Sequence, residues 1–127
     1  METPSKIAVY MDHFTAKVIE YTTTATEIKI IHSDFSHFEK QKILQKGESH
    51  LHHKEQDAQQ KFYKEIANYC ANYPQLLLFG PTTAKTEFKT IISNDNRFSD
   101  IEIMVNNTDK LTPNQQIAFV NNYFYLD

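Results

Sequence analysis

Short apolar stretches separated by polar residues predict three strands in the first third of the chain. Residues 6–11 are almost uniformly apolar, which is typical of a strand in the middle of a sheet. A second strand is predicted over residues 14–21. Alternating apolar and charged positions predict a third over residues 26–31, with Ile28 and Ile30 on the face opposite Glu27 and Lys29. The breaks between these segments are short, so we expect an antiparallel meander.

The next periodic segment, residues 55–73, has apolar positions at three- and four-residue steps and predicts an amphipathic helix. Its expected buried stripe is Ala58, Phe62, Ile66, Tyr69, Cys70 and Tyr73. Four consecutive apolar residues, 76–79, then predict a strand that is buried on both faces. Gly80 and Pro81 end this strand, and a helix is expected to begin directly afterwards.

The C-terminal part repeats the alternation of helix and strand. Residues 82–93 predict a helix whose inward positions are Ala84, Phe88, Ile91 and Ile92. Residues 101–105 predict a fifth strand. The last helix has a clear start signal, because Thr112, Pro113 and Gln115 occupy the cap, first-turn and capping-box positions. Its expected buried edge is Ile117, Val120 and Phe124.

The predicted order of elements is β-β-β-α-β-α-β-α. The fourth and fifth strands are joined through a helix, so they should be parallel with a right-handed crossover. We therefore predict an α/β fold of the ribonuclease-H-like type, with a mixed five-stranded sheet and helices on its faces. Residues 1–127 are expected to form one domain, with a long loop at about residues 32–54.

Composition narrows the classes of function. The formal net charge is −3, and the basic residues are twelve lysines and a single arginine, Arg97, which disfavours a dedicated DNA-reading surface. The single cysteine, Cys70, excludes a disulfide within the chain and is expected in the core. The sequence contains no predicted signal peptide or membrane span, so we expect a cytoplasmic protein.

The segment of residues 32–54 differs in character from the rest, because it holds five of the six histidines and four lysines. Such a segment favours contact with RNA or a ribosomal partner, since lysines pair with phosphates and histidines stack on bases. The expected contact residues are Lys40, Lys42, Lys46, Gly47, His50, His52, His53 and Lys54. A merely solvated loop is the plain alternative. A metal site that also uses His32 or His37 is a weaker one, because ligands must converge.

Two further groups of residues are candidates for chemistry. Gly80, Thr82, Thr83 and Lys85 begin a predicted helix and could hold an anion, although a simply capped helix start after a buried strand is the favoured interpretation. Asp12 and Asp109 follow strands and could hold metal ions together with Asp57 or Glu55. The alternative interpretation is that Asp12 forms a turn by bonding its own backbone.

Three sequence segments show a family resemblance: YMDHFTAKVIEY, LLLFGPTTAKTEFKTII and NNTDKLTPNQQIAFV. Together with the order of elements, they resemble the middle domain of the Pelota and class-1 eukaryotic and archaeal release-factor family. They also resemble its bacterial host-attachment-type relatives. In release factors of this family, a loop before the first helix carries the Gly-Gly-Gln motif that promotes peptidyl-tRNA hydrolysis.

The corresponding segment here is QKGESHLHHKEQ, with a single glycine, Gly47, and no glutamine directly after it. The resemblance therefore implies a non-catalytic, translation-associated module that contacts the ribosome or its RNA, with no cofactor and no metal. A metal-dependent hydrolase is one alternative. Another is a protein-interaction or homo-oligomerisation domain that uses the aromatic C-terminus, Tyr123 to Leu126.

Overall fold

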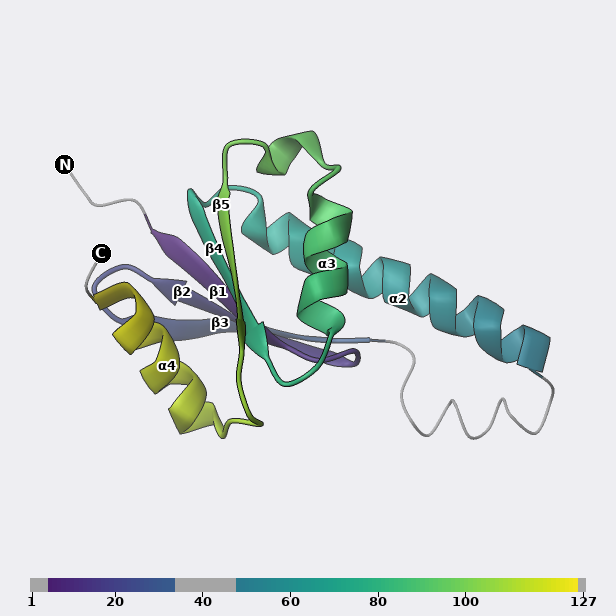
Figure 1. Ribbon diagram of the computed structural model, residues 1–127, viewed down its shortest axis with the longest axis horizontal. Coiled ribbons are helices and arrows are strands. Elements are labelled where there is room, and N and C mark those ends of the chain that lie inside the picture. The colour runs from purple at the N-terminus through teal and green to yellow at the C-terminus, as the bar shows by residue number, and fades with distance from the viewer. Residues whose placement is uncertain (1–4, 34–47, 126–127) are drawn as a thin grey trace.

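The computed structural model describes residues 5–33 and 48–125 (Figure 1). For residues 48–55 it describes the backbone alone. The elements in chain order are β1 (Lys6–Met11), β2 (Thr15–Tyr21), β3 (Ala25–His32), α2 (Glu48–Cys70), β4 (Gln75–Gly80), α3 (Ala84–Ile92), the short 3-10 helix η1 (Asn96–Phe98), β5 (Glu102–Asn107) and α4 (Pro113–Tyr125).

The strands form one five-stranded sheet in the order β3-β2-β1-β4-β5. β1, β2 and β3 pair antiparallel, whereas β4 pairs parallel with both β1 and β5. The turn between β1 and β2 is fixed by Asp12, whose Oδ1 accepts the backbone N–H groups of Phe14 at 2.7 Å and Thr15 at 2.8 Å. The predicted meander, the parallel pair and the mixed α/β sheet are confirmed.

Helices cover both faces of the sheet. Figure 1 shows α2 and α3 on one face and α4 on the other. β4 is an inner strand of the sheet, and its side chains contribute to both cores. Leu76 and Leu78 pack on the α2 and α3 side, and Leu77 and Phe79 pack on the α4 side. All four side chains are fully buried, which confirms a strand buried on both faces.

The helix α2 begins at Glu48, so the prediction of a loop up to residue 54 is wrong for residues 48–54. Among its described side chains, which start at Gln56, the first buried one is Phe62, and Figure 1 shows the first half of the helix extending past the sheet. A helical segment that projects past the sheet needs no apolar stripe, so the hydrophobic periodicity could not reveal this part. The helix also ends at Cys70, three residues before the predicted end.

The apolar alternation of the third strand does not correspond to burial of Ile28 and Ile30. Ile28 and Ile30 are 42% and 39% exposed. A bulge in the pairing places Ile19 opposite Glu27 and Val18 opposite Lys29, so Ile28 has no direct partner. As β3 is an edge strand, alternation alone did not decide which of its residues are covered.

Two predicted helix positions are also wrong. Ile91 of α3 is 49% exposed, and Tyr69 of α2 is 36% exposed. Within the described part of the chain, no helix has the length and apolar character needed to cross a membrane.

Candidate functional site

The parallel strands β1, β4 and β5 end at the same edge of the sheet, at Met11, Gly80 and Asn107. After β4 the chain passes to α3 on one face, and after β5 it passes to α4 on the other (Figure 1). In open α/β sheets, such a divergence of connections leaves a crevice where ligands bind. The candidate site is therefore this carboxyl edge.

Gly80 makes the edge compact. Its φ is +145°, and a Cβ at this position would lie 2.4 Å from the carbonyl oxygen of Met11. The Gly80 carbonyl in turn accepts the backbone N–H of Thr108 at 3.1 Å. Only glycine allows β1 and the β4–α3 turn to approach so closely.

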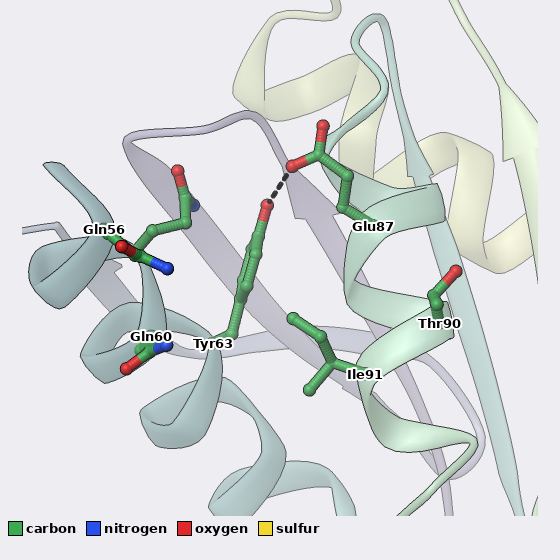
Figure 2. A pocket seen from close by; sticks show the side chains of 7 residues that line it. Gln56, Gln60, Tyr63, Glu87, Thr90 and Ile91 are labelled. Carbon is green, nitrogen blue, oxygen red and sulfur yellow. Dashed lines mark hydrogen bonds between the residues drawn. The ribbon is translucent and has the colours of Figure 1, made fainter. Parts of the chain in front are cut away.

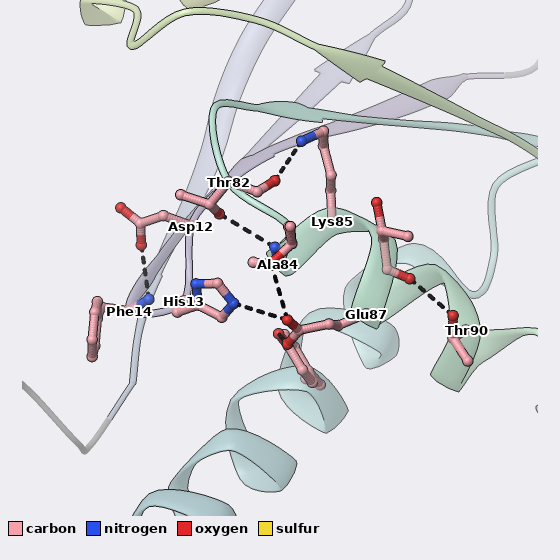
Figure 3. Close-up of polar contacts among 11 residues, drawn as sticks. Asp12, His13, Phe14, Thr82, Ala84, Lys85, Glu87 and Thr90 are labelled. Carbon is pink, nitrogen blue, oxygen red and sulfur yellow. Dashed lines mark hydrogen bonds and ion pairs between the residues drawn. The ribbon is translucent and has the colours of Figure 1, made fainter.

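The residues predicted for an anion site lie together at the start of α3, and several already have partners. The Thr82 hydroxyl oxygen accepts the N–H of Ala84 at 3.3 Å, and the Thr83 hydroxyl donates to Glu87 at 3.1 Å. Lys85 is buried, with 2% exposure, and its Nζ donates to the Thr82 carbonyl (Figure 3). Burial lowers the pKa of Lys85. The predicted anion site remains a prediction.

Glu87, in the first turn of α3, is a hydrogen-bond hub that the sequence analysis missed. Besides Thr83, it accepts from His13 Nε2 at 3.1 Å and from the Tyr63 hydroxyl at 3.1 Å (Figures 2 and 3). These contacts join the β1–β2 turn, α2 and α3. The residues lie up to 74 positions apart in the sequence, so no local pattern could have revealed the cluster.

The hub shifts the ionisation of its members. Burial alone would raise the pKa of Glu87, but the hydrogen bond from His13, together with those from Tyr63 and Thr83, lowers it. Burial and the neighbouring Glu87 carboxylate raise the pKa of Tyr63. The arrangement keeps Glu87 ionised and Tyr63 protonated at neutral pH.

A cavity of about 590 Å³ lies beside this hub, between α2 and α3 (Figure 2). Its lining residues are Gln56, Gln59, Gln60, Tyr63, Glu87, Thr90 and Ile91. The buried Gln59 Nε2 atom has no hydrogen-bond partner there. The exposed side chain of Ile91, predicted to face the core, borders this cavity instead.

A second hollow of about 720 Å³ lies at the same edge on the α4 side. We name it the α4-side crevice. Tyr10 and Lys17 of the sheet, Thr82 of the β4–α3 turn, and Lys110 and Thr112 before α4 are among its lining residues. Its outer wall is held in place because Leu111 N–H donates to the Tyr10 hydroxyl at 2.8 Å.

The start of α4 matches the predicted capping box. The N–H of Thr112 donates to Gln115 Oε1 at 2.9 Å, and the N–H of Gln115 donates to the Thr112 hydroxyl oxygen at 3.3 Å. Beside it, Gln116 is 3% exposed and its Nε2 donates to the Leu111 carbonyl at 2.9 Å.

Asp12 and Cys70, two of the residues considered for chemistry, have structural roles. Asp12 forms the β1–β2 turn, which confirms its turn-forming interpretation. Among the residues whose side chains the structure describes, 5–33 and 56–125, no three histidine, cysteine, aspartate or glutamate side chains gather in a way that could hold a metal ion. Cys70 is fully buried, as predicted, and burial raises its pKa to about 12.

The predicted RNA-contacting residues fall into two groups. Lys40, Lys42, Lys46 and Gly47 lie outside the described residues, as does His37. His50, His52, His53 and Lys54 lie on α2, in the part that begins at Glu48, rather than in a loop. The basic, histidine-rich stretch therefore includes the start of a long helix.

Comparison of the fold with solved structures finds two Pelota proteins and a translation termination factor. The Pelota protein of Thermoplasma acidophilum matches with a TM-score of 0.61 over 94% of this chain, at 12% identity. Pelota of Archaeoglobus fulgidus matches with 0.55 over 95%, at 13% identity. The archaeal translation termination factor aRF1 matches with 0.57 over 91%, at 14% identity.

The chain spans about a third of the length of these neighbours, 33%, 32% and 33% respectively. No protein-family model matches the sequence, and a search of curated proteins found no match. At such low identity the likeness concerns the fold. This chain shares the fold of a Pelota and release-factor domain, as its three sequence segments and its order of elements predicted.

Proposed function

We propose that this chain is a translation-associated binding domain that contacts the ribosome or its RNA, in the cytoplasm. The observation that carries the proposal is the fold likeness, which covers at least 91% of the chain and includes a protein described as a translation termination factor. The proposed contact surface is the Lys/His segment, which we define as residues 40–54.

The position of α2 supports this surface. Its first half extends past the sheet (Figure 1), and among its described side chains, which start at Gln56, the first buried one is Phe62. The Lys/His segment carries four lysines and three histidines against one acidic residue, Glu48, and Glu39 and Glu55 flank its two ends. Lys54 and the three histidines lie on the projecting part of the helix, and lysine and histidine suit contact with phosphates and bases.

Peptide release is not part of the proposal. The Gly-Gly-Gln motif of release factors of this family has no counterpart in QKGESHLHHKEQ, where Gly47 is a single glycine. The proposed module binds without catalysing hydrolysis of peptidyl-tRNA.

Sucrose-gradient sedimentation of the tagged chain tests the proposal. We expect the wild-type chain to sediment with ribosomal particles at low salt and to dissociate as salt rises, since phosphate contacts are salt-dependent. Replacing Lys42, Lys46 and Lys54 by glutamine should move the chain to the top of the gradient.

A matched control removes the same charge elsewhere, with glutamine at the exposed residues Lys29, Lys64 and Lys89. This variant should sediment like the wild type. The proposal is wrong if the wild-type chain stays at the top of the gradient at low salt, in stressed as well as growing cells. It is equally wrong if the control variant dissociates as readily as the first.

A further inference from the structure

The α4-side crevice has an unusual balance of charge. Lys17, on β2, and Lys110, in the segment before α4, both line it, and among the described residues neither has a carboxylate within salt-bridge distance. Asp12 is the one acidic side chain among the described lining residues, and its Oδ1 is already used by two backbone N–H groups. Two lysines thus border the crevice together with a single carboxylate, one oxygen of which already accepts two hydrogen bonds.

A third lysine, Lys85, contacts a residue of the crevice wall. Lys85 is 2% exposed, and its single described hydrogen bond goes to the carbonyl of Thr82, a residue that lines the crevice. An ammonium group has three donors, so two remain for other partners. A buried charge without a counter-ion is costly, and an anion nearby would reduce that cost.

The hydroxyl groups at the crevice are oriented by the backbone. The Thr82 and Thr112 hydroxyl oxygens each accept a backbone N–H, from Ala84 and Gln115. Each hydroxyl therefore keeps its own O–H free to donate. Lysine ammonium and hydroxyl donors around a hollow match a ligand whose oxygens only accept hydrogen bonds.

We infer that the α4-side crevice binds a phosphate group of a phosphate ester, held by Lys17, Lys110 and the hydroxyls of Thr82 and Thr112. Lys85 contacts the same wall through the Thr82 carbonyl. This site lies on the α4 side, away from the Thr83–Glu87 contact that occupies the start of α3. A crevice of about 720 Å³ has room for more than the phosphate itself, so the ligand carries an organic group.

The inference does not rest on the proposed ribosome contact, because it uses no residue of the Lys/His segment. If sedimentation with ribosomes fails while phosphate binding is found, the proposed function alone is contradicted.

The test is a titration of the isotope-labelled full chain, followed by backbone amide NMR in a buffer without phosphate. The probes are inorganic phosphate, adenosine monophosphate and a short uridine oligoribonucleotide. We expect saturable shifts centred on Thr15, Thr82 and Leu111, three residues that line the crevice.

Lys110→Gln is the first variant, because Lys110 is exposed and its loss should not affect folding. Combined with Lys17→Gln, it should weaken phosphate binding about tenfold, as expected when charge-assisted contacts are removed. The matched control, Lys29→Gln with Lys89→Gln, removes two exposed lysines that do not line the crevice and should leave binding unchanged.

The two organic probes identify the source of the phosphate. Tighter binding of the oligoribonucleotide than of the mononucleotide, with the same shifted signals, assigns the site to an RNA backbone. Equal or tighter binding of the mononucleotide assigns it to a free nucleotide. The inference is overturned if no probe gives saturable shifts, if the shifts spread over the whole surface, or if the control variant loses as much affinity as the crevice variant.

Discussion

At the scale of single residues, Gly80 determines the geometry of the carboxyl edge because it has no Cβ atom. Its position after four apolar residues predicted a strand end, and the structure adds the reason for glycine. A Cβ would meet the Met11 carbonyl oxygen at 2.4 Å, and φ is +145°. Both effects act against any other residue.

Gly80→Ala should therefore lower the free energy of unfolding by about 2–3 kcal/mol, through steric overlap and backbone strain. Urea denaturation followed by circular dichroism measures this change. Lys89→Ala, at an exposed position of α3, is the control and should be nearly neutral. A Gly80→Ala variant as stable as the wild type would contradict the strain argument.

Lys85 is a residue whose environment the sequence hinted at but did not settle. It lies three residues before Phe88 and seven before Ile92, which are both buried, so the helical spacing placed it near the inner face. The sequence analysis considered it only as part of an anion site. In the structure it is buried, and its Nζ donates to the Thr82 carbonyl at the helix start.

At the scale of elements, Glu87 connects three segments that otherwise touch mainly through apolar side chains. Its hydrogen bonds to His13 and Tyr63 join the β1–β2 turn and α2 to α3. Because these bonds favour the carboxylate, the folded state lowers the pKa of Glu87 below its ordinary 4.5. The stabilisation is therefore present above that pH and is lost as the pH falls through the lower, folded-state pKa.

Glu87→Gln should reduce the stability at pH 7 by roughly 0.5 kcal/mol, a small effect because the side chain is 49% exposed and solvent screens it. The difference from the wild type should shrink as the pH falls below 4.5. Urea denaturation from neutral to acidic pH measures both. Glu65→Gln, an exposed residue of α2, should show no such pH dependence, and a difference that persists in acid would contradict the role given to Glu87.

The helix α2 illustrates which parts of an element a sequence reveals. From Phe62 to Cys70 it packs on the sheet, and there the predicted stripe agrees with burial at Phe62, Ile66 and Cys70. Toward Glu48 the helix extends past the sheet, and its sequence there carries no apolar period and resembles a loop.

At the scale of the whole molecule, the sheet separates two apolar cores of different composition. Two helices cover one face, whereas α4 is the helix on the other, where Val120 and Phe124 pack against Leu77 and Phe79. The second core should therefore depend strongly on single residues of α4.

Phe124→Ala should lower the free energy of unfolding by about 3–5 kcal/mol, because Phe124 is 1% exposed and its removal leaves a cavity. Tyr125→Ala is the matched control, since this neighbouring side chain is 77% exposed. Thermal or urea denaturation of both variants measures the difference. If the Tyr125 variant is also strongly destabilised, or the chain proves oligomeric and only that variant dissociates, then Tyr125 has a partner that the single chain does not show.

The sequence by itself determined the order of strands and helices, the mixed α/β class and the likeness to Pelota and release factors. These depend on local signals: runs of apolar residues, helical stripes, Gly80 and the Thr112 cap. Only the tertiary structure decided what meets at the carboxyl edge, because His13, Tyr63 and Glu87, or Lys17 and Lys110, come from distant segments. Local pattern reflects burial along one element, whereas a site is formed where several elements end together.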